Sequence, residues 1–276
     1  MPILQCGRFK LDLDRPKVMA IINLTDDSFS GDGLQGDVRA ALARAERALE
    51  EGADMLDIGA ESSRPGADPV PEAVELERVV RFVELARPWQ VPLSIDTVKP
   101  AVMVAALAAG ADMINDINAF RAPGAIDAVA DGTAGLCLMH MQGEPRTMQQ
   151  DPRYDDVVGE VMAFLDERVA ALEAAGAVRE RIVLDPGFGF GKRTVHNYAL
   201  LRELERFSAG GLPVLAGMSR KSMLGAVTGR EVGERLAASV AAALIAVQRG
   251  AAIVRVHDVA PTLDALKVWQ ATLGIE

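Results

Sequence analysis

The chain has 276 residues, half of them hydrophobic and few aromatic, so its length admits one large domain or two small ones. Its formal net charge of −10 at pH 7 excludes nucleic acid and anionic membranes as expected partners, because both bind basic surfaces. Two cysteines without CxxC spacing argue against disulfides and zinc, and the lack of a signal-like or membrane-length apolar stretch predicts a soluble cytoplasmic protein.

Short β-rich runs alternate with longer runs of helical period along the chain. Residues 3–13 alternate around Cys6 and Gly7, which predicts a β-hairpin. Eight strand–helix cycles then follow: 17–23 with 38–52, 54–59 with 71–86, 91–96 with 100–110, 111–116 with 122–132, 134–140 with 155–176, 181–186 with 196–207, 212–217 with 233–250, and 251–258 with a last helix.

Apolar strands that alternate with helices predict a parallel sheet covered on both faces. Eight such cycles within this length favour closure into a (β/α)8 TIM barrel, with an open doubly wound sheet as the alternative. No linker or low-complexity break divides the chain, so we expect one domain over residues 1–276. The N-terminal hairpin is expected to cover the barrel floor.

Polar residues follow the strands with a regularity that points to a site, because the carboxyl ends of barrel strands share one face. Asp96, Asn115 and Asp185 each end a separate apolar strand. One such residue alone is usually a cap or a turn residue. Three around a mostly apolar cavity suit a flat heterocycle with several N–H donors, because buried carboxylates require donors.

Basic residues predict an anion site at the same face. Arg255 and His257 alternate along the eighth strand, so their side chains point to the same side. Together with Arg64 and Asn23 they could hold a diphosphate, with a divalent metal on the Asn23 oxygen. The alternative for Arg255 is a salt bridge to a neighbouring acid such as Asp258.

The segment "GMSRKSMLG" adds Ser219 and Lys221 at an expected helix start, where free N–H groups attract an anion. Arg220 beside them is expected to point to solvent. Among the histidines, His196 is expected at a helix start. For His140 two roles stay open, facing the heterocycle or satisfying a buried carbonyl.

Eight motifs together resemble bacterial dihydropteroate synthase over nearly the whole chain. They are "MAIINLTDDSFSGDG", "DIGAESSRPGA", "LSIDTVKP", "INDI", "LMHMQGEPRTMQ", "DPGFGFGK", "GMSRKSMLG" and "RVHDV". The resemblance implies a transferase of folate biosynthesis that condenses 6-hydroxymethyl-7,8-dihydropterin diphosphate with 4-aminobenzoate, giving 7,8-dihydropteroate and diphosphate. It also implies Mg2+ as cofactor, sulfonamides as competitors of aminobenzoate, and a homodimer.

The resemblance assigns site residues, which overlap between ligands. For the pterin they are Asp96, Asn115, Asp185, Lys221 and Arg255. For the diphosphate they are Asn23, Ser63, Arg64, Arg255 and His257, with Asn23 on Mg2+. For 4-aminobenzoate they are Ser63, Pro65, Phe190, Ser219 and Lys221. The catalytic set is Asp96, Lys221, Arg255, His257 and Arg64.

Loss of the leaving group can precede attack by the amine, because the reduced pterin donates electron density to the developing cation. The expected work of the site is therefore electrostatic stabilisation. Phe29 and Asp32 are expected to help loop one close over the site. This loop departs from the family pattern, because Asp26 replaces a common proline and Gly31 displaces the following acid to Asp32.

Two other functions are weighed. A methyltransferase that uses a methylated folate would need Asp96, Asn115 and Asp185 but not "SRPG", "SRK" and "RVHD" together. A non-catalytic pterin-binding paralogue would explain the altered loop one. Retention of Phe29, Ser63, Arg64, Ser219 and Lys221 favours the synthase.

Overall fold

A closed barrel of parallel strands forms the centre of the computed structural model, which describes residues 3–24, 34–61 and 69–274, without the side chains of 34–37. The strand order is β10-β3-β4-β5-β6-β7-β8-β9. The bounds are β3 (Lys17–Asn23), β4 (Met55–Gly59), β5 (Leu93–Asp96), β6 (Met113–Asp116), β7 (Gly135–Met139), β8 (Ile182–Asp185), β9 (Val214–Ala216) and β10 (Ala251–Val256). The closed order confirms the predicted (β/α)8 barrel over the open sheet.

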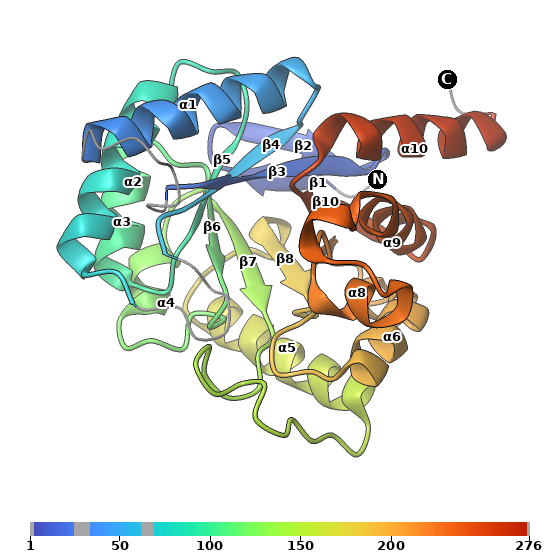
Figure 1. Cartoon of the computed structure of the whole chain (residues 1–276). Coiled ribbons are helices and arrows are strands. Elements are labelled where there is room, and N and C mark those ends of the chain that lie inside the picture. Colours follow the sequence, from blue (N-terminus) through green and yellow to red (C-terminus); the bar gives the residue numbers. More distant parts are fainter. Residues whose placement is uncertain (1–2, 25–33, 62–68, 275–276) are drawn as a thin grey trace.

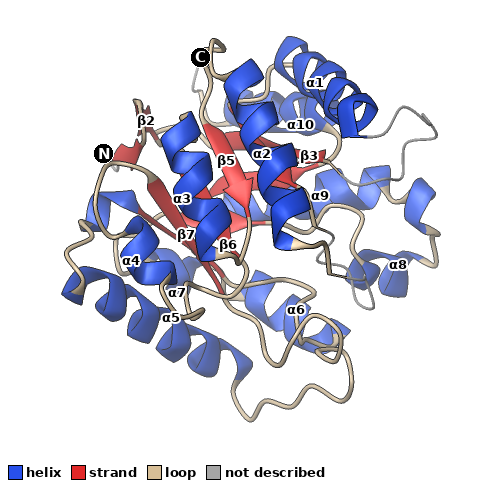
Figure 2. Cartoon of the chain, turned by 90° about the vertical axis from the view of Figure 1, so that its left-hand side faces the viewer, coloured by secondary structure: helices blue, strands red, loops and turns tan. Residues whose placement is uncertain are grey.

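Helices surround the strands on the outside (Figure 1), and α2 and α3 lie in front of the sheet in Figure 2. The bounds are α1 (Leu34–Glu50), α2 (Glu72–Ala86), α3 (Pro100–Ala109), α4 (Ala125–Val129), α5 (Val157–Ala174), α6 (Thr194–Arg202), α7 (Glu205–Ser208), α8 (Ser222–Thr228), α9 (Leu236–Gln248) and α10 (Val259–Thr272). None of these helices, within the described ranges, is long and apolar enough to cross a membrane.

Two predicted helices differ from the observed ones. The helix predicted over 196–207 is two helices in the structure, α6 and α7, joined through the buried Leu204. The segment 122–132 contains only the five residues of α4. Gly124, the residue before α4, takes a left-handed φ of +81°, so the helix begins only at Ala125.

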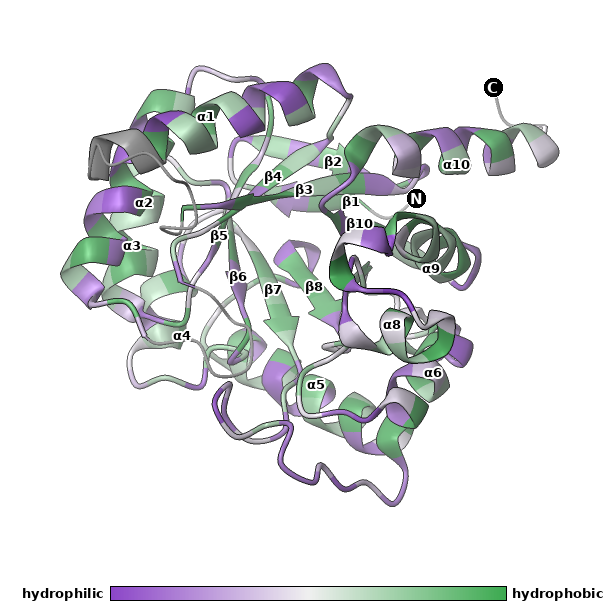
Figure 3. Ribbon diagram, viewed as in Figure 1, coloured by the Kyte–Doolittle hydropathy of each residue, from purple (hydrophilic) through white to green (hydrophobic). Residues whose placement is uncertain are grey.

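Alternate strand residues point into the barrel, and at the barrel floor these inward residues are apolar. One buried cluster joins residues of seven strands to the hairpin; its strand members are Met19, Met55, Met113, Cys137, Val183, Leu215 and Ile253. The larger cluster lies between the strands and the helices. In Figure 3, β7 and β8 are coloured as hydrophobic, whereas the surrounding helices carry both colours.

The N-terminal hairpin closes the floor, as predicted. Strands β1 (Ile3–Cys6) and β2 (Phe9–Asp12) pair antiparallel, and Leu4 and Cys6 join the interior cluster. Both cysteines are free and buried. Gly7 takes a φ of +57° at the turn, where a Cβ would lie 2.5 Å from Asp112 Oδ1.

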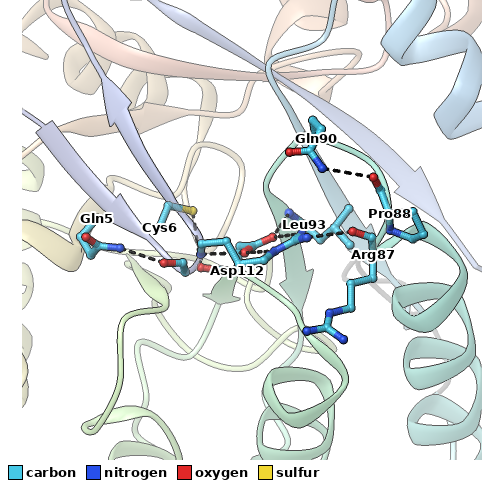
Figure 4. Close-up of polar contacts among 9 residues, drawn as sticks. Gln5, Cys6, Arg87, Pro88, Gln90, Leu93 and Asp112 are labelled. Carbon is cyan, nitrogen blue, oxygen red and sulfur yellow. Dashed lines mark hydrogen bonds and ion pairs between the residues drawn. The ribbon is translucent and has the colours of Figure 1, made fainter.

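Asp112, just before β6, ties the hairpin to the barrel (Figure 4). Its Oδ1 accepts hydrogen bonds from Arg8 N and Arg8 Nε, both at 3.0 Å. Its Oδ2 accepts from Arg8 Nη2 at 2.8 Å and from Leu93 N at 3.1 Å. Four donors thus share one buried carboxylate, which explains why an acid stands at this position.

We predict that Asp112→Asn lowers the free energy of unfolding by about 2–4 kcal/mol. The asparagine side chain has an NH2 group in place of one carboxylate oxygen, so this donor would face the N–H of Leu93 or the Arg8 guanidinium, which are donors themselves. Urea denaturation measures this change. The matched control is Asp264→Asn on the exposed side of α10, which should change stability by less than about 0.5 kcal/mol. Equal stability of the two variants would contradict the assigned role of Asp112.

Candidate active site

Two residues above the apolar floor, the inward positions of the barrel become polar. Asp57 follows Met55 by two positions in β4, Asn115 follows Met113 in β6, and Arg255 follows Ile253 in β10. The period of two in a strand sends these side chains to the same interior as the floor. A polar layer therefore lies directly on the hydrophobic one.

Asp57 is fully buried at the centre of this layer. Its Oδ1 accepts a hydrogen bond from Ser94 Oγ at 2.6 Å. Its Oδ2 accepts from Arg255 Nε at 2.5 Å and from Asn115 Nδ2 at 3.2 Å. Sequence reasoning missed Asp57, although a lone acid inside the apolar run "MLDIG" was a usable signal.

Arg255 lies between two carboxylates. Besides its bond to Asp57, its Nη2 donates to Asp96 Oδ2 at 2.9 Å. Arg255 therefore forms salt bridges to acids, as the alternative expected, but its partners are Asp57 and Asp96 and not Asp258. Asp258 instead binds the Arg220 guanidinium, through Nε at 3.1 Å and Nη2 at 2.5 Å, so Arg220 is ion-paired and not merely solvated. Arg255 Nη1 makes no hydrogen bond to any residue of the described ranges.

Asp96 and Asn115 stand side by side, because the β5–β6 register pairs their Cα atoms. Burial raises the pKa of Asp96 to about 7, the Arg255 guanidinium opposes the rise, and the Asp57 carboxylate adds to it. Asn115 donates to Asp57, but its Oδ1 is buried and accepts no hydrogen bond from the described part of the chain. Such a buried orphan acceptor is costly unless a ligand supplies a donor.

Asp185 and Lys221 extend the polar layer toward the loops after β8 and β9. Burial raises the pKa of Asp185, and the Lys221 ammonium lowers it. Burial lowers the pKa of Lys221 to about 8, with Asp185 opposing. Lys221 Nζ donates to Phe188 O at 2.5 Å and lies 4.6 Å from the centre of the Phe190 ring.

His257 and Ser219 connect the loops after β10 and β9. Ser219 Oγ lies 3.0 Å from His257 Nδ1 and accepts from His257 N at 3.2 Å. Asn23 ends β3 with an exposed side chain, and its backbone oxygen accepts from Arg44 Nη2. His257 is the first residue after β10, and its contact with Ser219 places it near the start of α8.

The other two histidines make contacts within the protein, His196 near the surface and His140 in the interior. His196 Nδ1 accepts from Arg193 N at 3.2 Å, which confirms its position at the start of α6. His140 Nδ1 lies 2.9 Å from Lys192 Nζ, and burial lowers the pKa of His140 to about 2. Lys192 is thus a partner of the His140 ring that sequence reasoning missed, and the two open roles of His140 stay predictions.

The remaining predicted residues cannot be placed. Phe29, Asp32, Ser63, Arg64 and Pro65 lie outside the described residues, as do Asp26 and Gly31 of the altered loop one. Beside the polar layer, a cavity of about 640 Å³ opens. Its walls include Asp96, Thr97, Ile117, Arg121, Met141 and Arg146.

The comparisons agree with this geometry. The pterin binding enzyme family matches residues 19–257. The dihydropteroate synthase of Neisseria meningitidis serogroup B is 52% identical, over 98% of this chain and 97% of that protein. The Burkholderia cenocepacia dihydropteroate synthase, complexed with 7,8-dihydropteroate, is 60% identical with a TM-score of 0.91, covering 99% of this chain and 96% of that one. The Xanthomonas albilineans dihydropteroate synthase with 4-aminobenzoic acid is 55% identical with a TM-score of 0.93, covering 100% and 99%.

We predict that Asp57→Asn lowers the pKa of Asp96 from about 7 to about 6 or below. Removing the Asp57 charge relieves repulsion and leaves the Arg255 guanidinium to Asp96 alone, so the Asp96 carboxylate becomes easier to form. The pH titration of the Asp96 carboxyl carbon by NMR measures this. Asp258→Asn, which alters only the pair with Arg220, is the control and should leave the titration unchanged. A rise in the Asp96 pKa in Asp57→Asn would contradict the pairing.

Proposed function

The chain belongs to the dihydropteroate synthases of the pterin binding enzyme family, which are transferases, and we propose how its barrel mouth divides their two substrates. The reaction joins 6-hydroxymethyl-7,8-dihydropterin diphosphate to 4-aminobenzoate. The observation that carries the proposal is the buried polar layer, in which Asn115, bonded to Asp57 and beside Asp96, keeps an acceptor that no described residue satisfies.

The pterin binds in the polar layer. Its ring N–H groups can donate to Asn115 Oδ1 and to the further acceptor positions of the Asp96 and Asp185 carboxylates, because each carboxylate oxygen accepts more than one hydrogen bond. Lys221 supplies a donor for the ring carbonyl. The guanidinium of Arg255 is held by its bonds to Asp57 and Asp96, and its planar face can stack on the pterin ring.

The diphosphate lies above the pterin, toward the loops. Arg255 donates two of its nitrogens to carboxylates and has Nη1 left for a phosphate oxygen. His257 and Asn23 come from the strands on the same side of the mouth, since β10 pairs with β3. Ser63 and Arg64 belong to this group by resemblance and lie outside the described residues.

Mg2+ is part of the proposal, with the exposed carboxamide oxygen of Asn23 as its protein ligand. Among the described residues, no three or more His, Cys, Asp or Glu form a group that could hold a metal ion. A single amide oxygen fits Mg2+, because this ion keeps several waters and takes further ligands from substrate phosphates. When bound, it would neutralise charge on the departing diphosphate.

The aminobenzoate lies between the loops after β8 and β9. Phe190 gives an apolar wall for its ring, and Lys221 beside that wall offers a positive charge. Ser219 lies within hydrogen-bond distance of His257 and so connects the aminobenzoate side to the diphosphate side. Pro65 and Ser63 complete the wall by resemblance. Sulfonamides are expected to compete at this position.

The chemistry is electrostatic. The bond between the pterin methylene and the diphosphate oxygen breaks with its electrons going to diphosphate; the amine nitrogen then bonds to the methylene and loses a proton. Arg255 and His257 stabilise the leaving anion, and the Asp96 carboxylate stabilises the cationic pterin. With a pKa of about 7, Asp96 is half ionised near neutrality, so a positive ring favours its ionised form. No side chain becomes covalently attached.

We also propose a homodimer in the cytoplasm. Large apolar side chains are exposed along the neighbouring elements α8 to α10: Val227, Val232, Leu236, Ile245, Val268 and Leu273. Clusters of exposed apolar residues of this kind are typical of subunit contacts. The two free, buried cysteines suit a reducing compartment.

The expected activity is release of diphosphate that requires the pterin diphosphate, 4-aminobenzoate and Mg2+ together, with formation of 7,8-dihydropteroate. The measurement is coupled detection of diphosphate with each component omitted in turn. Release without aminobenzoate would indicate hydrolysis, and pterin binding without release would favour the non-catalytic paralogue. Methyl transfer from a methylated folate would favour the methyltransferase.

Single substitutions should separate the two subsites. Arg255→Ala should weaken binding of the pterin diphosphate by about 100-fold, because a charged donor is lost to the phosphate. Asp185→Asn should weaken binding of the pterin about tenfold and change aminobenzoate affinity less. Calorimetric titration of each variant measures both affinities. Changes within a factor of about two would refute the assignments.

A further inference from the structure

The loop 186–191 after β8 is held by side chains along its whole backbone. Within "PGFGFG", every carbonyl from Gly187 to Gly191 accepts a hydrogen bond from a side chain. Lys221 binds Phe188 O at 2.5 Å, Gln149 binds Gly189 O at 2.5 Å, and Tyr154 Oη binds Gly191 O at 2.8 Å. The two remaining carbonyls share one donor.

That donor is Lys192, which is 3% exposed. Its Nζ lies 2.9 Å from Gly187 O, 2.9 Å from Phe190 O and 3.2 Å from His140 O. It also lies 2.9 Å from His140 Nδ1. Burial lowers the pKa of Lys192 well below its ordinary value, and the Asp185 carboxylate opposes this shift. One amine thus joins both ends of the loop to the end of β7.

The glycines of the loop require this close arrangement. Gly187 has a φ of +71°, and a Cβ there would lie 1.9 Å from His140 O. Gly191 has a φ of +59°, and a Cβ there would lie 2.3 Å from Gln142 O. Left-handed glycines are flexible in themselves, so a fixed loop shape depends on external donors.

The loop presents groups to both proposed substrates. Asp185 directly precedes it, with Oδ1 accepting from Gly187 N at 2.7 Å, and Phe190, near its end, lies against Lys221. Among the described residues, the Lys192 ammonium bonds only to carbonyls of this loop and to His140, and to no residue of the polar layer.

We propose that Lys192 is a positioning residue, which fixes the loop 186–191 so that Asp185 and Phe190 stand at the right places for the pterin and the aminobenzoate. The proposal rests on the proposed function. A displaced loop weakens both substrate sites before and during the reaction, so KM should rise more than kcat falls.

The test compares wild type with Lys192→Met, which keeps an unbranched side chain, one atom shorter, and removes the donor. We expect KM for 4-aminobenzoate and for the pterin diphosphate to rise at least about tenfold at a temperature well below melting, with a smaller change in kcat. The control is Lys267→Met on the exposed face of α10, which should match wild type.

Hydrogen exchange gives a readout that does not depend on activity. The amides of Gly187, Gly189 and Phe190 are bonded within the protein, so they should exchange faster in Lys192→Met without substrates. Unchanged loop exchange, or faster exchange with unchanged KM, would overturn the proposal. If wild type itself forms no dihydropteroate, the proposed function fails. The hydrogen exchange of the loop amides still tests, independently of activity, whether Lys192 fixes the loop 186–191.

A second variant covers failure of Lys192→Met to fold. Tyr154→Phe removes only the hydroxyl that donates to Gly191 O, next to Lys192. It should fold, speed exchange of the same loop and raise both KM values in the same direction by a smaller factor. Wild-type KM values in Tyr154→Phe together with faster loop exchange would overturn the positioning role.

Discussion

The bond of Arg255 to Asp57 and Asp96 determines the rest of the site. Arg255 is half-buried and Asp57 is fully buried, so the guanidinium favours anionic partners and the carboxylate requires donors, and each residue stabilises the other in the barrel. Their contact joins β10 to β4 across the interior, and the bond to Asp96 extends it to β5. Because two of the Arg255 nitrogens are engaged, the guanidinium plane is fixed before any ligand arrives, and the cost of orienting it at the time of reaction is small.

The same barrel separates stability from function along its axis. At the floor, Asp112 and the hairpin close the apolar layer, and every partner of Asp112 is a protein donor. At the mouth, Asn115 keeps an acceptor that the described protein does not satisfy. The two layers are only two residues apart in each strand, which shows how the alternation of inward side chains changes a packed core into a binding surface within about 7 Å.

Much of this arrangement could be predicted from the sequence. The apolar runs gave the eight strands and the closed barrel, and Asp96, Asn115 and Asp185 stood out because each ends such a run. Asp57 did not, since it lies inside a strand and its partner Arg255 is 198 positions away. Lys192 was invisible for another reason: its acceptors are backbone carbonyls, which carry no residue signature. The helix predicted over 122–132 is shorter in the structure, because Gly124 takes a left-handed φ of +81° and α4 begins only after it.

The most direct test of this account is the energetic coupling between Asp57 and Arg255 in binding of the pterin diphosphate. Calorimetric titration of wild type, Asp57→Asn, Arg255→Gln and the double variant completes the cycle. If Asp57 acts by fixing Arg255, the double variant binds about as weakly as Arg255→Gln alone, with a coupling of at least about 1 kcal/mol. Additive losses within about 0.3 kcal/mol would show that the two residues act independently and would contradict the account.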